Sequence, residues 1–209
     1  MILKTALFEV PLYKTKVKKH VEINDWFLQN IYQTFLKNGV NEKSRNIYSS
    51  YFPNAPKLDK KIFDGFYQHE IKNFMLKAGF NTNHNWIVRT NYWYNIGLEN
   101  SYQEVHDHLG GPVIINYAAI HFLKFNKNVH AGTVFYNPLE AVLKSTLPTT
   151  NEKIKPNDYQ GLQKVVQVEQ EDLIIFPAYL PHSVMTQNSN EERITIAFNL
   201  SIYEKQFDD

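Results

Sequence analysis

Two histidines separated by one residue, His106 and His108, are the side chains in this sequence best placed to do chemistry together. In an extended strand, residues i and i+2 point to the same side, so both imidazoles would face one way and Asp107 the other. Two imidazoles and one further ligand would form a facial set that leaves open positions on Fe, Zn, Cu or Ni. His182 is the best candidate for the third ligand, because it begins a predicted strand just after a buried strand and a turn.

The remaining histidines are weaker candidates for a metal site. His20, His69 and His84 lie in polar or helical contexts, where we expect surface positions, and His130 lies in a predicted loop, where we also expect exposure. His121 shares strand parity with Tyr117 and could lie near a pocket, although a hydrogen-bonded histidine in the core is the more common outcome for such a position.

Arg193 follows His182 by eleven residues and opens a segment in which apolar and polar residues alternate. This alternation places Arg193, Thr195 and Asn199 on one face and the apolar residues on the other. An arginine that points inward among apolar strands is costly unless it meets an anion. A planar guanidinium beside a hydroxyl is suited to bind a carboxylate through two hydrogen bonds. The alternative is a structural ion pair with Glu171 or Glu191.

The segments before residue 86 predict a strand and two helices that would support this site. Residues 1–13 alternate like a strand that ends at Pro11, and residues 40–57 have the composition of a loop. A first helix repeats apolar residues at 27, 31 and 35, with Asn24 or Asp25 as its cap and Gly39 as its end. A second helix has an apolar stripe over 63–75 and stops at Gly79. Both stripes indicate helices that pack on a sheet.

From Trp86 onward the pattern predicts β structure, with turns at Gly, Pro and Asn. The expected architecture is mainly β with some α: a jelly roll, or double-stranded β-helix, over 86–203, with the helices of 1–85 packed on one face, all in one domain of residues 1–209. Residues 137–161 are too long for a hairpin and are either a lid or a surface insertion. The candidate strands are 86–96, 102–108, 112–125, 132–136, 162–168, 172–176, 183–187 and 192–203.

The composition favours a soluble globular enzyme. The chain has 209 residues, 43% of them hydrophobic, a net charge of +1 and no cysteine. The absence of cysteine leaves histidines and carboxylates as metal ligands and excludes disulfides. The lack of a long apolar run predicts no membrane segment. The near-zero net charge makes nucleic acid an improbable partner. The short basic clusters at 14–20 and 57–61 are expected to be solvated surface. We expect a cytoplasmic protein, with a homodimer as a base-rate expectation.

Several motifs in fixed order resemble the 2-oxoglutarate and Fe(II)-dependent oxygenases, in particular small oxygenases of marine bacteria and their phages. The resemblance covers nearly the whole chain. Single motifs are modestly specific, but the ordered set is strongly so. The motifs are LFEVPL at 7–12, NYWYN at 91–95, QEVHDH at 103–108, GTVFYNP at 132–138, IFPAYLPHSV at 175–184 and ERITIAFN at 192–199.

The resemblance implies a double-stranded β-helix that uses Fe(II) and 2-oxoglutarate, with O₂ and an unidentified second substrate that is hydroxylated as succinate and CO₂ are released. It implies that iron is held at the positions of His106, His108 and His182. It also implies that 2-oxoglutarate is bound by Arg193, with Thr195 and Tyr117 as further contacts. The resemblance also implies that Trp93 and Asn95 line the pocket, and Asn199, on the same strand face as Arg193, is a further candidate for the lining.

This sequence departs from the wider superfamily at His108, where an aspartate or glutamate is usual. A neutral imidazole there leaves the site one unit more positive, which should alter its redox potential and metal preference. Two alternatives remain open. One is a cupin-like enzyme with three histidines that does not use 2-oxoglutarate, since three imidazoles also describe a catalytic zinc site. The other is a non-catalytic jelly-roll binding protein.

Overall fold

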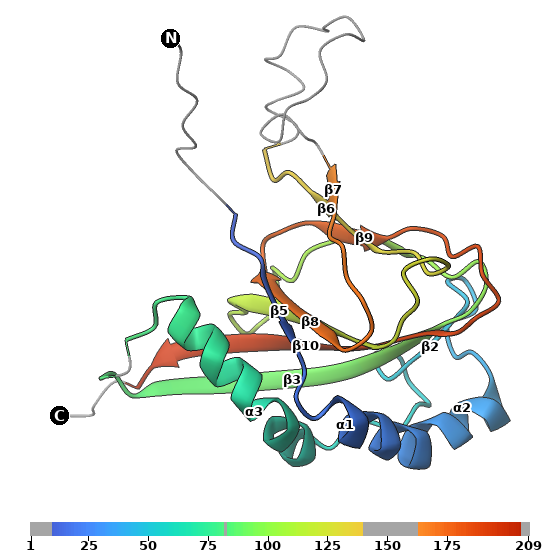
Figure 1. Cartoon of the computed structure of the whole chain (residues 1–209), viewed down its shortest axis with the longest axis horizontal. Coiled ribbons are helices and arrows are strands. Elements are labelled where there is room, and N and C mark those ends of the chain that lie inside the picture. The colour runs from blue at the N-terminus through green and yellow to red at the C-terminus, as the bar shows by residue number, and fades with distance from the viewer. Residues whose placement is uncertain (1–9, 82, 140–162, 206–209) are drawn as a thin grey trace, which may run out of the picture.

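The computed structural model describes residues 10–81, 83–139 and 163–205 and contains two antiparallel sheets and a layer of helices (Figure 1). The helical elements are α1 (His20–Phe27), the π-helical turn η1 (Leu28–Tyr32), α2 (Gln33–Asn38) and α3 (Lys60–Lys77). The strands are β1 (Tyr13–Lys16), β2 (Ile47–Ser49), β3 (Trp86–Gly97), β4 (Gln103–His106), β5 (Tyr117–Lys124), β6 (Thr133–Tyr136), β7 (Gln163–Val165), β8 (Asp172–Pro177), β9 (His182–Val184) and β10 (Arg193–Glu204).

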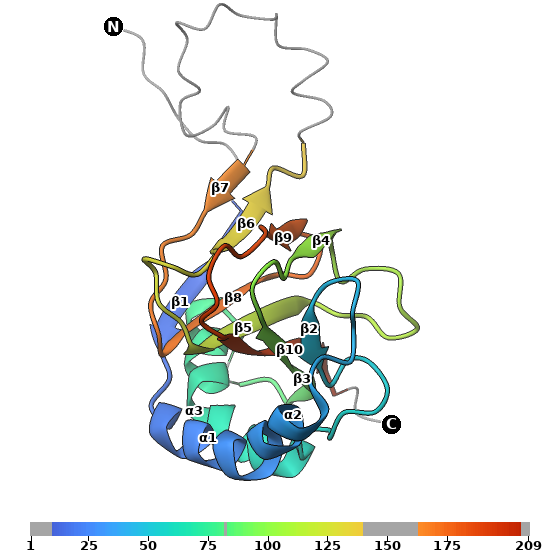
Figure 2. The ribbon, with the colours of Figure 1, turned by 90° about the vertical axis from the view of Figure 1, so that its right-hand side faces the viewer.

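The strand order is that of a jelly roll, as predicted. The larger sheet runs β1-β8-β5-β10-β3-β2, and the smaller runs β4-β9-β6-β7. In the larger sheet, the longest pairing joins β10 to β3. It runs from Arg193 opposite Gly97 to Glu204 opposite Trp86. Figure 2 shows the smaller sheet above the larger one and the helices below it. The larger sheet therefore has one face toward the helices and one toward the interior of the jelly roll.

The first helical stretch forms because apolar residues recur every fourth position. Ile23, Phe27, Ile31 and Phe35 are all buried against the sheet. The stretch ends where predicted, at Gly39, whose φ of +68° is a conformation that glycine adopts without steric cost. It begins at His20 rather than after Asn24 or Asp25. The predicted cap is wrong because residues 20–23 already turn helically and bury Ile23.

The second helix, α3, has a side-chain cap that its sequence pattern did not single out. The Asp59 carboxylate accepts a hydrogen bond from the backbone N–H of Ile62 at 3.0 Å, which satisfies one of the free donors of the first turn. The helix ends at Lys77, before Gly79 with φ +85°, close to the predicted stop. Its buried face, which includes Phe63, Tyr67 and Phe74, packs on the larger sheet.

The two faces of the larger sheet contribute to two separate hydrophobic clusters. On β10, Ile194, Ile196 and Phe198 belong to the cluster packed under the helices. On β5, Ala118 and Phe122 point away from the helices and belong to a second cluster inside the jelly roll. The alternation predicted for residues 193–199 is thereby confirmed. Arg193 and Thr195 alternate with these apolar residues of β10, so they face the interior, where the pocket lies.

Several boundaries differ from the sequence-based expectation. The first described strand is Tyr13–Lys16, which begins after Pro11, the residue where the predicted strand should end. Residues 1–9 lie outside the described part. The predicted loop 40–57 contains β2, which adds an edge strand to β3. Of the predicted lid, residues 140–161 lie outside the described part as well. Within the described ranges, no helix is both long and apolar enough to cross a membrane.

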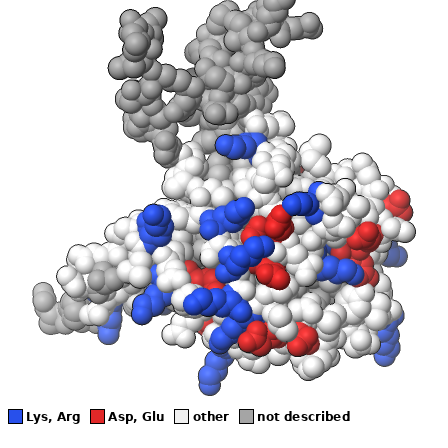
Figure 3. Space-filling model, in the orientation of Figure 1, with Lys and Arg blue, Asp and Glu red and all other residues white. Residues whose placement is uncertain are grey.

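Charged side chains on the face in Figure 3 are interspersed in sign. Lys16 lies 3.2 Å from the buried carboxylate of Asp172, and Lys127 lies 2.5 Å from Glu169. The predicted basic cluster at 14–20 therefore includes solvated lysines with acidic partners. His20 is an exception: it is buried, and its Nδ1 lies 3.0 Å from Nε2 of His121, so the expected surface position is wrong.

Candidate metal and co-substrate site

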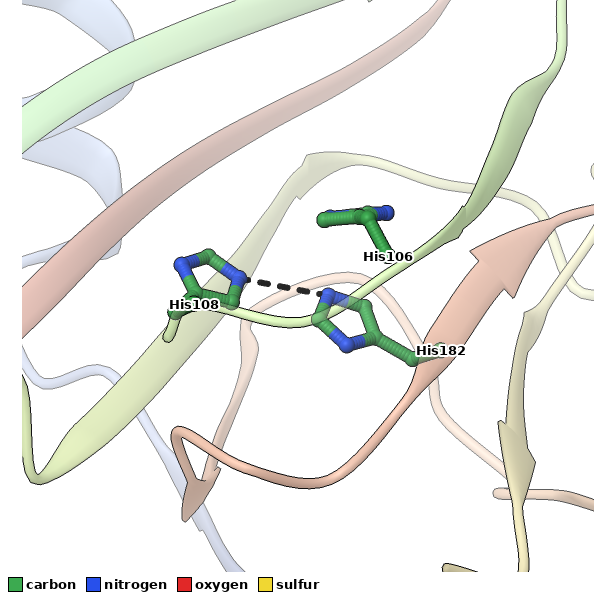
Figure 4. A group of neighbouring side chains, drawn as sticks. All are labelled: His106, His108 and His182. Atoms are coloured by element: carbon green, nitrogen blue, oxygen red, sulfur yellow. Dashed lines mark hydrogen bonds between the residues drawn. The ribbon is translucent and has the colours of Figure 1, made fainter. Parts of the chain in front are cut away.

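Three histidines converge inside the jelly roll, as the sequence predicts (Figure 4). His106 ends β4 and lies opposite His182, the first residue of β9, in the pairing of these two strands. His108 follows β4 in the loop, where the Ala178 carbonyl accepts its backbone N–H at 2.9 Å. One ring nitrogen from each of the three histidines lies within 4.8 Å of the others. Such a group of nitrogens can hold one metal ion.

Backbone carbonyls set the tautomers of two of these imidazoles. Nδ1 of His106 donates to the Glu104 carbonyl at 2.9 Å, and Nδ1 of His182 donates to the Leu180 carbonyl at 3.0 Å. A carbonyl oxygen can only accept, so Nδ1 carries the proton and Nε2 keeps its lone pair for a metal. Nε2 of His182 lies 3.4 Å from Nε2 of His108. The lone pairs are therefore arranged before any metal binds.

Burial also keeps two of these histidines uncharged. Burial lowers the pKa of His108 to about 4, and the nearby His106 adds to this effect. Burial lowers the pKa of His182 to about 3, again with His106 contributing. Metal binding requires the neutral form of the imidazole, so neither group has to lose a proton at neutral pH. In donor chemistry, placement and protonation, the cluster fits a divalent transition-metal ion.

The histidines form one end of a pocket with about 690 Å³ of empty space, counting its open mouth. Trp93 and Asn95 of β3 line it, as predicted, and the Trp93 ring lies 5.9 Å from the His108 ring. Arg193 and Thr195 of β10 line the same pocket. The pocket thus brings together residues from seven strands and from the loops on both sides of β4, which are far apart in the sequence.

Arg193 is the buried charge of this pocket and is only 7% exposed. Its Nε donates to the Ala131 carbonyl at 3.1 Å, while its Nη2 is buried without a hydrogen-bond partner. Burial lowers its pKa to about 10. No ion pair to Arg193 forms among the described residues, so the alternative pairing with Glu171 or Glu191 is wrong. A buried guanidinium with a free N–H is suited to receive an anion.

Residues 91–199, a little over half of the chain, match the protein family described as "Putative 2OG-Fe(II) oxygenase". The chain belongs to this family. Its cofactors are accordingly Fe(II) and 2-oxoglutarate, which agrees with the three histidines and the buried arginine. Membership in an enzyme family also favours the enzyme over the non-catalytic alternative. No curated protein matches the sequence of this oxygenase.

Solved structures of similar fold cover most of the chain at low identity. The non-heme alpha-ketoglutarate-dependent carbocyclase SnoK from nogalamycin biosynthesis has a TM-score of 0.58 and 11% identity, covering 92% of this chain and 79% of its own. A prolyl-4-hydroxylase of Pseudomonas putida has a TM-score of 0.55 and 9% identity, covering 91% and 92%. HygX of Streptomyces hygroscopicus, with nickel and 2-oxoglutarate bound, has a TM-score of 0.55 and 9% identity, covering 92% and 83%. These likenesses support the jelly-roll fold.

One predicted residue, Tyr117, lies elsewhere than expected, whereas Asn199 faces the interior beside a metal ligand. Tyr117 packs on the helix side of the larger sheet, with its ring 4.8 Å from that of Phe74, and does not line the pocket. Its parity on β5 is odd, whereas the interior residue Ala118 is even, so the expected contact with 2-oxoglutarate is not made. Asn199 is half-buried beside His108, where its carboxamide opposes the lowering of the His108 pKa.

Three residues near the site were missed or misplaced from the sequence. Gln103 lines the pocket, and its amide donates to Nε2 of His106 at 3.2 Å. Thr133 is 1% exposed, and its Oγ1 has no partner. The GTVFYNP motif was the only signal for it. His130, expected on the surface, is buried, and Arg193 helps to lower its pKa after the larger effect of burial.

Proposed function

We propose that this oxygenase couples the oxidative decarboxylation of 2-oxoglutarate to the hydroxylation of a second substrate. One O₂, one 2-oxoglutarate and one C–H substrate would give succinate, CO₂ and the hydroxylated product, with one oxygen atom in each organic product. The observation that carries the proposal is that three histidines whose ring nitrogens converge share one pocket with a buried arginine that has a free N–H. Iron sites and dicarboxylate sites need these two sets of groups respectively.

In this proposal, His106, His108 and His182 hold Fe(II) through their Nε2 atoms. When bound, Fe(II) supplies the redox chemistry for O₂. The protein contributes neutral donors whose Nδ1–H groups on His106 and His182 are already held by backbone carbonyls. Such contacts fix ring orientation and make the imidazole a better donor. Metal binding would therefore not require these two rings to turn, and the Gln103 amide would release Nε2 of His106 to the ion.

Arg193 would bind the distal carboxylate of 2-oxoglutarate, with Thr195 as a second donor. The guanidinium presents parallel N–H groups that match a carboxylate, and its Nε is fixed by the Ala131 carbonyl. The pairing would also satisfy Nη2, which has no other partner. The position of Arg193 at the first residue of β10 fixes which end of the pocket receives the carboxylate.

The rest of the lining would exclude water and admit the second substrate. Ala118, Ile120 and Phe176 form an apolar wall of the pocket, and Trp93 lies next to His108. A dry wall strengthens the electrostatic contacts of Arg193 and limits side reactions. The named activities of structurally similar proteins include prolyl hydroxylation and carbocycle formation, so the fold alone does not select the substrate.

The proposal is tested by succinate formation. Protein reconstituted with Fe(II) and supplied with O₂ and 2-oxoglutarate should release more than one succinate per chain, measured by NMR. His182→Ala should abolish this release, because it removes one of three ligands. His69→Ala is the matched control, since His69 is an exposed histidine on α3 and should leave the release unchanged. Equal succinate formation by wild type and His182→Ala would overturn the proposal.

A further inference from the structure

We propose that the neutral side chain at position 108 makes metal retention depend on 2-oxoglutarate, so that this protein holds its metal firmly only while the co-substrate is bound. The inference rests on the proposed function and concerns the thermodynamics of the same site. It follows from the charges that line the pocket.

Apart from the three histidines, Arg193 is the only ionic side chain among the described residues that line the pocket. An imidazole that binds a metal ion through one ring nitrogen does so in its neutral form. No aspartate or glutamate is part of this described lining. The ligand set therefore offers three lone pairs but no negative charge.

The acidic residues nearest in sequence are turned away from the metal ligands. Asp107 is exposed, and its Oδ1 accepts a hydrogen bond from the Leu109 backbone N–H at 2.9 Å. Glu104 is exposed and pairs with Arg45. Glu192, next to Arg193, is hydrogen-bonded to Tyr32 and Lys124. These carboxylates are engaged elsewhere and do not supply the missing charge inside the pocket.

A divalent ion bound here would share a partly dry pocket with Arg193, and nothing within the ligand set would offset their combined charge of three. Like charges in a low-dielectric site repel strongly. 2-Oxoglutarate carries two negative charges and would contact both the ion and Arg193. Its binding would therefore remove most of the repulsion that opposes metal binding.

Coupling between two ligands is reciprocal: if 2-oxoglutarate tightens metal binding by some factor, the metal tightens 2-oxoglutarate binding by the same factor. Direct contact between the two ligands contributes to this factor in any such site. Such coupling would also exist with an aspartate at position 108, because a fixed charge acts on the metal equally with and without the co-substrate. What is particular to this chain is the metal affinity of the protein without co-substrate, because an aspartate at position 108 would supply a permanent negative charge. That charge would stabilise the metal without co-substrate and would also repel the co-substrate.

The test is a Mn(II) titration of the whole protein, without O₂, with the free ion measured by electron paramagnetic resonance. The Mn(II) dissociation constant is measured with and without saturating 2-oxoglutarate, and their ratio is the coupling factor. His108→Asp is compared with His108→Asn, which has nearly the same shape but no charge. His108→Glu and His108→Gln form a second pair in case the shorter side chains fail to reach the ion or to fold.

Without 2-oxoglutarate, we expect wild type and the neutral variants to have Mn(II) dissociation constants at least about tenfold higher than those of the acidic variants, because one unit charge a few ångströms away is worth at least this much. Saturating 2-oxoglutarate should lower the dissociation constant of wild type into the range that the acidic variants reach without it. Equal Mn(II) dissociation constants without 2-oxoglutarate within each pair would overturn the inference while leaving the proposed function intact. Failure of wild type to bind Mn(II) at any 2-oxoglutarate concentration would instead overturn the proposed function, and the inference with it.

Discussion

Replacing Arg193 by methionine should have opposite effects on the free protein and on co-substrate binding. Burial lowers the Arg193 pKa from 12.5 to about 10. Each pKa unit corresponds to about 1.4 kcal/mol, so this lowering of the pKa means that burying the charge costs the free protein roughly 3 kcal/mol. Methionine removes this cost and fills similar space. It also leaves the Ala131 carbonyl without its partner, which costs about 1–3 kcal/mol.

The net expectation for Arg193→Met is a free protein that is as stable as wild type or more stable by up to about 2 kcal/mol. For a chain of this size, each kcal/mol is worth about 2–4 °C in Tm. Loss of the buried partner of a carboxylate costs about 2–5 kcal/mol, so the Kd for 2-oxoglutarate should rise roughly 30- to several-thousand-fold. A structural arginine would behave differently, since its removal would destabilise the free protein.

The assay is thermal unfolding with and without 2-oxoglutarate, combined with calorimetric titration of the co-substrate. Arg89→Met is the matched control, because Arg89 is an exposed arginine that lies over the Tyr203 ring at 5.2 Å, away from the pocket lining. The control should keep the ligand-induced rise in Tm, and Arg193→Met should lose it. The reasoning would be refuted if Arg193→Met lowered the Tm of the free protein by several degrees and bound 2-oxoglutarate as tightly as wild type.

Three further predictions concern the metal site, the pH dependence and the core. Co(II) should quench tryptophan fluorescence, and Trp93→Phe should lose most of this quenching, because Trp93 is 5.9 Å from the His108 ring; undiminished quenching would contradict the site. Burial lowers the pKa of His20 and His121 below 6.5, so the unfolded chain binds more protons and stability should fall as pH drops below about 6.5. His20→Gln removes one titration and should show a smaller loss of Tm between pH 7 and pH 5.5, and an equal loss would count against this origin. Phe198→Ala should cost about 3–5 kcal/mol in urea unfolding, because Phe198 is fully buried; a cost below about 1 kcal/mol would show that the core collapses around the gap.

The parts of the site that could be predicted are those set by short-range geometry. The alternation of a strand placed Arg193 with Thr195, and the pattern of His106 and His108 indicated two imidazoles on one side. That reasoning was right in outcome, although β4 ends at His106 and the loop carries His108. The fold class followed from the same periodicities, since two helical stripes before a run of short strands leave few architectures.

The parts that failed depend on contacts between distant segments. Tyr117 was assigned to the pocket, but no local pattern tells which face of β5 meets the helices; the contact with Phe74 settles it. His20 looked exposed because its partner His121 lies 101 residues away. Thr133 has no distinguishing neighbour in the sequence, and its burial results from the closure of the smaller sheet. Only the folded chain provides this information.

The central claim is that His106, His108, His182 and Arg193 form one site for Fe(II) and 2-oxoglutarate. The most direct test is an anaerobic titration of the protein with Fe(II) and 2-oxoglutarate, followed by visible absorption. We predict a charge-transfer band that requires both ligands, saturates at one equivalent of each per chain and is lost in His182→Ala. Absence of the band in folded wild-type protein, or its persistence in His182→Ala, would contradict the claim.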